Sequence, residues 1–219
     1  RVPGFGADIA GGRLGFHMTF RNEGTLVSAS GRLEAAGTDV AALGVTTFSG
    51  KFDTLVDVAG VGESVTQIMQ SLGGAGQITA RALRFPGLDP LAASRVQQQW
   101  QGKDPPANMN ALISAIEQEL PKSAWMPGMI TVPLTITRGA ARIGPAQHEL
   151  NNIVASGQAL IDLRAASLSA AVSLSHRDEI SPTDIAVAWS GPLSAPKRSI
   201  DASSMLNRLQ LSAITREQE

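Results

Sequence analysis

The stretch that decides the fold is Ile130-Thr131-Val132-Pro133-Leu134-Thr135-Ile136-Thr137, in which every second residue is aliphatic. Successive side chains of a β-strand point to opposite faces of the sheet, so this alternation predicts a strand with one apolar and one polar face. Proline has no backbone N–H to share with a neighbouring strand. Pro133 therefore predicts that this strand lies at an edge or contains a bulge.

The same alternation recurs along the chain, so the two-faced strand is the repeating unit of the protein. Its apolar positions include Leu14, Phe16, Met18 and Phe20; Phe52, Val56 and Val58; Ile78, Ala80 and Ala82; Leu168, Ala170, Val172 and Leu174; and Ile185, Val187 and Trp189. Turn-forming residues separate the runs at Asn22–Gly24, Arg138–Gly139, Asn151–Asn152 and His176–Asp178. This spacing is typical of an antiparallel meander, and it predicts a mainly β protein with a few helices.

Helical periodicity is confined to three places. Asp89-Pro90 is a typical N-cap followed by proline, and Leu112, Ile113, Ile116 and Leu120 form an apolar stripe that ends before Pro121. We therefore expect a helical insertion over about residues 88–121, a short helix or turn over 63–71, and a C-terminal helix over about 201–214 capped by Asp201.

The strands and helices fit a single module over residues 1–219. Strands are expected over about residues 8–60, 74–84 and 129–190, around the helical insertion. Pro127-Gly128 is the best candidate for a domain boundary, but strands on both sides of the helices can belong to one sheet.

Composition narrows the classes of function. The 219 residues carry 18 Lys+Arg and 19 Asp+Glu, a net charge of −1, and no cysteine. Near-zero charge argues against a nucleic-acid-binding surface, as do aromatic residues at only 4% with no tyrosine. The lack of cysteine excludes disulfides, thiolate metal sites and iron–sulfur clusters.

The sequence offers no constellation for catalysis, a cofactor or a metal. A Ser/His/Asp triad could draw on Ser175, His176 and Asp178, but consecutive strand residues point to opposite faces. The glycines at 73–76 precede a strand rather than a helix, so they are turn residues and not a phosphate-binding loop. We therefore expect no catalytic, cofactor-binding or metal-binding residues.

The histidines are few and scattered. His17 falls on the polar side of a strand, and His176 falls at a strand end. His148 stands close to Asn151-Asn152, in a segment that is typical of a turn. We expect His148 to be an exposed turn residue.

Three segments resemble the C-terminal region of the AsmA family. Residues 71–78 (SLGGAGQI) and 85–91 (FPGLDPL) are similar to one family signature, and residues 190–201 (SGPLSAPKRSID) to the ending that precedes a terminal helix. Residues 129–163 fit the strand succession between them, so the resemblance spans about residues 44–214. The chain departs from the family pattern at Pro90, where leucine is common, and in the length of its helical stretch.

The resemblance implies an inner-membrane protein of Gram-negative bacteria with a periplasmic body that acts in phospholipid transport and outer-membrane biogenesis. It also implies a long, curved sheet with an apolar concave face and open edges. The chain begins Arg1-Val2-Pro3 and has no apolar run long enough to span a bilayer. We therefore expect an excised segment, with an N-terminal membrane anchor in the upstream part of the same chain.

An apolar sheet face can be covered by a second sheet, by helices or by lipid tails. If a phospholipid or another acyl-chain lipid is the partner, the candidate lipid-facing residues are Leu14, Phe16, Met18, Phe20, Phe52, Val56, Val58, Ile130, Val132, Leu134 and Ile136. The same residues would form the core of a closed β-sandwich. The alternatives are a structural or protein-interaction module of the envelope with a sealed core and, third, a hydrolase.

Overall fold

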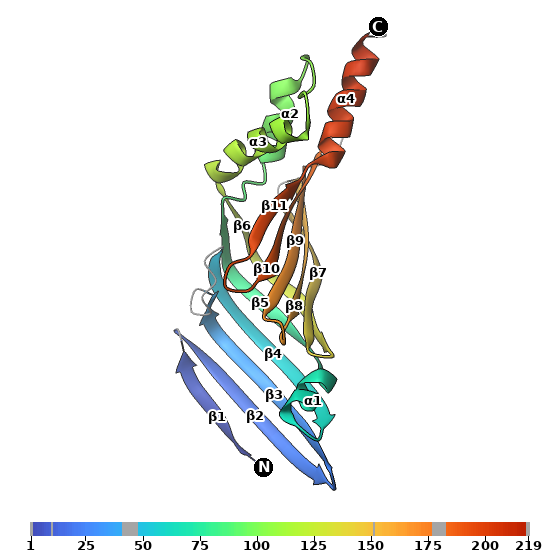
Figure 1. The fold of residues 1–219 in the computed structure, drawn as a ribbon. Helices are drawn as coiled ribbons and strands as arrows, with labels where there is room; N and C mark the ends of the chain where they lie inside the picture. Colours follow the sequence, from blue (N-terminus) through green and yellow to red (C-terminus); the bar gives the residue numbers. More distant parts are fainter. Residues whose placement is uncertain (1, 10, 41–47, 151, 177–182, 218–219) are drawn as a thin grey trace.

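The computed structural model describes residues 2–9, 11–40, 48–150, 152–176 and 183–217. Eleven strands form one antiparallel sheet, and their order in the sheet is their order along the chain (Figure 1). The strands are β1 (Val2–Ile9), β2 (Gly12–Glu23), β3 (Leu26–Asp39), β4 (Ser49–Gly62), β5 (Gly73–Pro86), β6 (Ala124–Thr137), β7 (Ala140–Leu150), β8 (Ile153–Asp162), β9 (Ser167–His176), β10 (Thr183–Pro192) and β11 (Lys197–Asp201). The predicted mainly β class and the antiparallel meander are confirmed.

The sheet is open, because among the described residues β1 and β11 each pair with one neighbour only. Its two faces follow the predicted alternation. Directly opposed residues lie on the same face, and one row across the sheet runs through Phe16, Leu33, Val56, Gly76, Leu134, Ile143, Ala159, Ala170 and Trp189. We call the face that carries this row the apolar face.

Some strand boundaries differ from the prediction. β1 begins at Val2 although the first strand was expected near residue 8, and β11 was not predicted. β6 begins at Ala124 and passes through Pro127-Gly128, so the candidate domain boundary lies inside a strand. The glycines of β1 and the charged side chains of β11 hide the alternation from which strands were recognised.

The helices form where the sequence predicted them. They are α1 (Val65–Ser71), α2 (Ala92–Trp100), α3 (Met109–Glu119), the 3-10 turn η2 (Leu120–Lys122) and α4 (Ser203–Glu217). Ser64 caps α1 by accepting a hydrogen bond from Gln67 N, and Asn108 caps α3 by accepting one from Ala111 N. α2 starts later than its predicted cap, because Asp89 Oδ1 accepts from Leu91 N and forms a turn before the helix.

Buried side chains form two clusters. The helix-end cluster lies where α2, α3 and α4 gather at one end of the sheet (Figure 1), and it includes Val96, Leu112, Ile116, Leu174, Val187 and Met205. The sheet cluster consists of Val56, Leu134 and Ala141, with Leu33, Val58, Ile78, Ile136, Ile143 and Ile161 packed against them. Since the sheet cluster draws on every strand from β3 to β8, curvature of the sheet brings its two halves together there.

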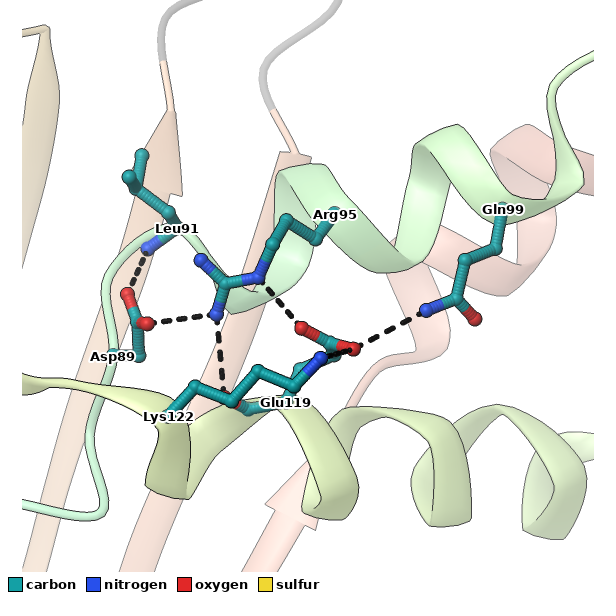
Figure 2. Close-up of polar contacts among 6 residues, drawn as sticks. All are labelled: Asp89, Leu91, Arg95, Gln99, Glu119 and Lys122. Carbon is teal, nitrogen blue, oxygen red and sulfur yellow. Dashed lines mark hydrogen bonds and ion pairs between the residues drawn. The ribbon is translucent and has the colours of Figure 1, made fainter.

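A polar network fixes α2 against the end of α3 (Figure 2). Arg95 Nη2 lies 2.7 Å from Asp89 Oδ2, and Arg95 Nε lies 2.6 Å from Glu119 Oε2. Lys122 and Gln99 contact the other carboxylate oxygen of Glu119. Hydrogen bonds from Lys122 and Arg95 lower the pKa of Glu119 below its usual value. These carboxylates are saturated with donors, so the network serves to hold the helices in place.

Candidate functional site: an apolar groove where the sheet parts

The strands β6 and β7 pair over only part of their length. Their register covers Leu134–Thr137 on β6 and Ala140–Ile143 on β7. Beyond the pair Leu134–Ile143, β6 continues alongside β5, and β7 continues alongside β8. The sheet therefore divides at this point into two branches, both of which extend toward the helices.

Two prolines explain why the ladder stops there. The ladder ends at the pair Leu134–Ile143. Pro133 directly precedes Leu134 on β6, and Pro145 follows Ile143 by two positions on β7. Gln77, which is opposite Pro133, directs its carbonyl toward β4, where it accepts from Thr54 Oγ1. Antiparallel alternation then directs the backbone nitrogen of Pro133 toward β7, where it has no hydrogen to donate. At Pro133 strand β6 is thus an edge on its β7 side, although it stays paired with β5 on the other side.

A cavity of about 400 Å³ lies between the two branches, on the apolar face. It joins the helix-end cluster to the sheet cluster, because Phe85 and Trp125 line it at one end and Ile78, Ile143 and Ile161 at the other. The rest of the lining is Val40, Phe48, Phe52, Ala80, Leu83, Ile130, Val132, Gly144, Ala146, His148, Ala155, Ser156, Gly157, Gln158, Ala159, Ala170, Ala171 and Val172. We call this cavity the groove; its volume lies within the range of ordinary ligand sites.

The structure divides the sequence-predicted lipid-facing residues into three groups. Phe52, Ile130 and Val132 line the groove. Val56 and Leu134 are buried in the sheet cluster, with Val58 and Ile136 packed against them. Val56 and Leu134 are 1% and 9% exposed, whereas Val58 and Ile136 are half-buried. Leu14, Phe16, Met18 and Phe20 lie on β2, outside the groove, and Phe16 and Phe20 are 39% and 45% exposed.

Sequence reasoning missed the aromatic end of the groove. Phe48, Phe85 and Trp125 stack in series, with ring centroids 5.1 Å and 5.3 Å apart. Phe85 and Trp125 are opposed across β5 and β6, but the pairing of these strands shifts register twice just before them. These irregularities break the alternation, so the period of two could not place either ring on the apolar face.

His148 corrects a prediction. It is not an exposed turn residue: it lies within β7, opposite Ala155, with its side chain half-buried in the wall of the groove. Between the pairs Ile143–Ala159 and Ala146–Gly157, β7 carries one extra residue, so Gly144 and Pro145 stand opposite Gln158. This bulge keeps Ala146 and His148 on the apolar face, and it hides their alternation with Ile143.

The remaining polar residues of the groove wall belong to the other face of the sheet. Ser156 and Gln158 alternate with Ala155, Gly157 and Ala159, and they also line depressions on the opposite side. Among the described residues that line the groove, His148 and the indole N–H of Trp125 are therefore the polar side-chain groups on the apolar face. Charged side chains lie on the polar face, where for example Arg32 Nε is 2.7 Å from Asp57 Oδ1. A hydrogen bond from Arg32 lowers the pKa of Asp57.

The described part of the chain shows no cluster of metal-binding side chains. Within it, no group of three or more His, Asp or Glu side chains is placed to hold a metal ion. Of the Ser/His/Asp triad considered from the sequence, Ser175 and His176 are consecutive on β9, and Asp178 lies outside the described residues. The groove can enclose an apolar ligand, since its lining is mainly aliphatic and aromatic.

Comparisons with known proteins identify no relative: no family model, no curated protein and no solved structure matches the chain. None of the helices formed by the described residues combines the length and apolar character needed to cross a membrane.

Proposed function

We propose that the chain is a non-catalytic, lipid-handling module whose groove holds an acyl chain of a phospholipid or another lipid. The observation that carries this proposal is the groove itself, an apolar cavity that the protein leaves unfilled where its sheet divides. Together with the AsmA resemblance, it supports a periplasmic module of an envelope protein that is anchored in the inner membrane and acts in phospholipid transport or outer-membrane biogenesis.

The groove matches an acyl chain in length and chemistry. From Ile78 to Phe85 its wall follows β5 for about 20 Å, at the usual rise of about 3 Å per residue. Burial of each methylene contributes about 0.8 kcal/mol, so about ten methylenes contribute about 8 kcal/mol. Association costs about 4 kcal/mol or more in lost freedom. The free energy gained by burying the methylenes therefore exceeds the lower bound of the association cost. No catalytic or charged group is needed for binding.

A second candidate is a structural or protein-interaction module of the envelope. The sheet cluster favours it, because there Val56, Leu134 and Ala141 of the apolar face are buried by the protein itself. Such a module would act through its sheet edges, β1 and β11, by pairing with a further strand. A strand-pairing module does not require the groove to be occupied, and this difference separates the two candidates.

The deciding experiment is lipid extraction and mass spectrometry of the purified protein beside two variants of one strand. Val132→Asp places a charge inside the groove, whereas Thr131→Asp places the same charge on the exposed opposite face of β6. We expect co-purified lipid with the wild type and Thr131→Asp, and its loss with Val132→Asp, when all three give the same circular dichroism spectrum. Wild-type protein with no more lipid than Val132→Asp would reject lipid handling and favour the strand-pairing module.

A further inference from the structure

Both ends of the groove are bounded by packed side chains of the protein. At the helix end, the wall includes Phe85 and Trp125, which belong to the helix-end cluster or pack against it. At the other end, the wall includes Ile78, Ile143 and Ile161, which pack against the buried sheet cluster. The groove therefore has a finite length, and an occupant that lies along the strands meets a packed cluster at either end.

The side chains of β8 mark the same length. On the apolar face, this strand carries in succession Ile153, Ala155, Gly157, Ala159 and Ile161. The three small residues line the groove, whereas Ile153 is buried outside its lining. A Cβ at Gly157 would come no closer than 3.4 Å to a neighbouring atom, so the sheet itself does not require glycine there. Small side chains thus form the floor of the groove along β8, and this floor ends at Ile161.

The two walls give the same span. Along β5 the lining extends from Ile78 to Phe85, and along β8 it extends from Ala155 to Ile161. At a rise of about 3.3 Å per residue, each of these segments is about 20 Å long. Single carbon–carbon bonds of about 1.5 Å at near-tetrahedral angles advance an extended chain by about 1.3 Å per carbon. The groove therefore accommodates at most about fifteen carbons of a straight chain.

We propose that the groove limits the acyl chain that it encloses to about fifteen carbons, and that Ile161 is the residue that sets this limit. A longer chain leaves part of its hydrocarbon in water or displaces packed side chains of the sheet cluster, and either outcome costs free energy. This inference rests on the proposed lipid-handling function, and it adds the length class of the acyl chain and the residue that determines it.

The inference is tested with unbranched fatty acids, from octanoic to eicosanoic acid, as competitors of the fluorescent apolar probe N-phenyl-1-naphthylamine. Their carboxylate stays in water, so successive members of the series differ only in hydrocarbon. Each methylene that enters the groove should tighten binding by about fourfold. We expect the wild type to show this gain up to about fifteen carbons at most, and almost no gain from hexadecanoic to eicosanoic acid.

Two variants of one residue should move the limit in opposite directions. Ile161→Ala should extend the gain by about two carbons, because the side chain that it removes reaches about 2.5 Å beyond Cβ. Ile161→Phe should shorten it, because a longer side chain then occupies the end of the groove. Ile200→Ala is the matched control: it makes the same truncation at a half-buried isoleucine of β11 that does not line the groove, and it should keep the wild-type limit.

The outcomes separate this inference from the function on which it rests. If the fatty acids displace the probe but the gain continues through eicosanoic acid, the length limit is refuted and the acyl groove stands. The same holds if Ile161→Ala, with the circular dichroism spectrum of the wild type, keeps the wild-type limit. If the wild type binds neither the probe nor the fatty acids, both proposals fail. A misfolded Ile161→Ala leaves the wild-type series and Ile161→Phe to decide.

Discussion

Truncation of two valines on the same face of the sheet tests where the sealed core ends and the groove begins. Val56 on β4 is 1% exposed and belongs to the sheet cluster. Val132 on β6 is half-buried and lines the groove. Val56→Ala and Val132→Ala remove the same two methyl groups, so any difference between them comes from the surroundings.

The expected magnitudes follow from burial. Two fully buried methyl groups contribute about 1.6 kcal/mol by transfer, and the cavity left behind raises the loss for Val56→Ala to about 2.5 kcal/mol. Val132 already faces a cavity, so Val132→Ala should lower the free energy of unfolding by about 1 kcal/mol or less. For a chain of this size, 1 kcal/mol shifts Tm by about 2–4 °C.

The assay is urea and thermal unfolding of delipidated protein, monitored by circular dichroism. Binding of the fluorescent apolar probe N-phenyl-1-naphthylamine is measured on the same samples. We expect Val56→Ala to lose more stability and to keep its probe affinity, and Val132→Ala to lose less and to change its probe affinity. Equal losses of about 2.5 kcal/mol would mean that Val132 is packed as tightly as Val56. The open groove would then be refuted.

Other predictions address a glycine of the sheet, the polar network of the helical insertion, and the proline at which the pairing of β6 with β7 stops. Gly76→Ala should prevent or severely weaken folding, because a Cβ there would lie 2.1 Å from Leu55 O; expression and circular dichroism check this. Arg95→Met should lower the free energy of unfolding in urea titration, because it leaves Asp89 and Glu119 without their shared cation. The pKa of Glu119 is lowered in the folded state, so its contribution to stability is present at neutral pH and is lost as pH falls below about 4.5. Urea midpoints at pH 7 and pH 3.5 should therefore differ more for the wild type than for Glu119→Gln. Pro133→Thr should lengthen the ladder between β6 and β7 and reduce probe binding. Unchanged hydrogen exchange in both strands would mean that Pro133 does not end this ladder.

The sequence predicted those features that depend on local order. Strict alternation in Ile130–Thr137 and Leu168–Leu174 identified strands, and the stripe through Leu112, Ile116 and Leu120 identified α3. The caps at Ser64 and Asn108 were not predicted, although they are equally local, since each side chain accepts a hydrogen bond from a backbone N–H three residues ahead. The candidate residues of the groove were predicted only where alternation is uninterrupted, as at Phe52, Ile130 and Val132.

His148 shows the limit of that reasoning. Its face depends on the bulge at Gly144-Pro145, and a single inserted residue moves every later side chain to the other face. Gly-Pro indicates a break in a strand, but the register that results is fixed only by pairing with β8. The aromatic end of the groove was missed for the same reason, because the register shifts before Phe85 hide its alternation.

By itself, then, the sequence determined that this protein is a meander of two-faced strands with a helical insertion, because side-chain direction in a strand follows from position alone. Only the tertiary structure decided which part of the apolar face is core and which part is groove. Val56 and Val132 carry the same side chain in the same alternating pattern, yet one meets Leu134 and Ala141 across the curved sheet and the other borders the cavity. Curvature and the parting of β6 from β7 are long-range properties, set by contacts between strands that are distant in the chain.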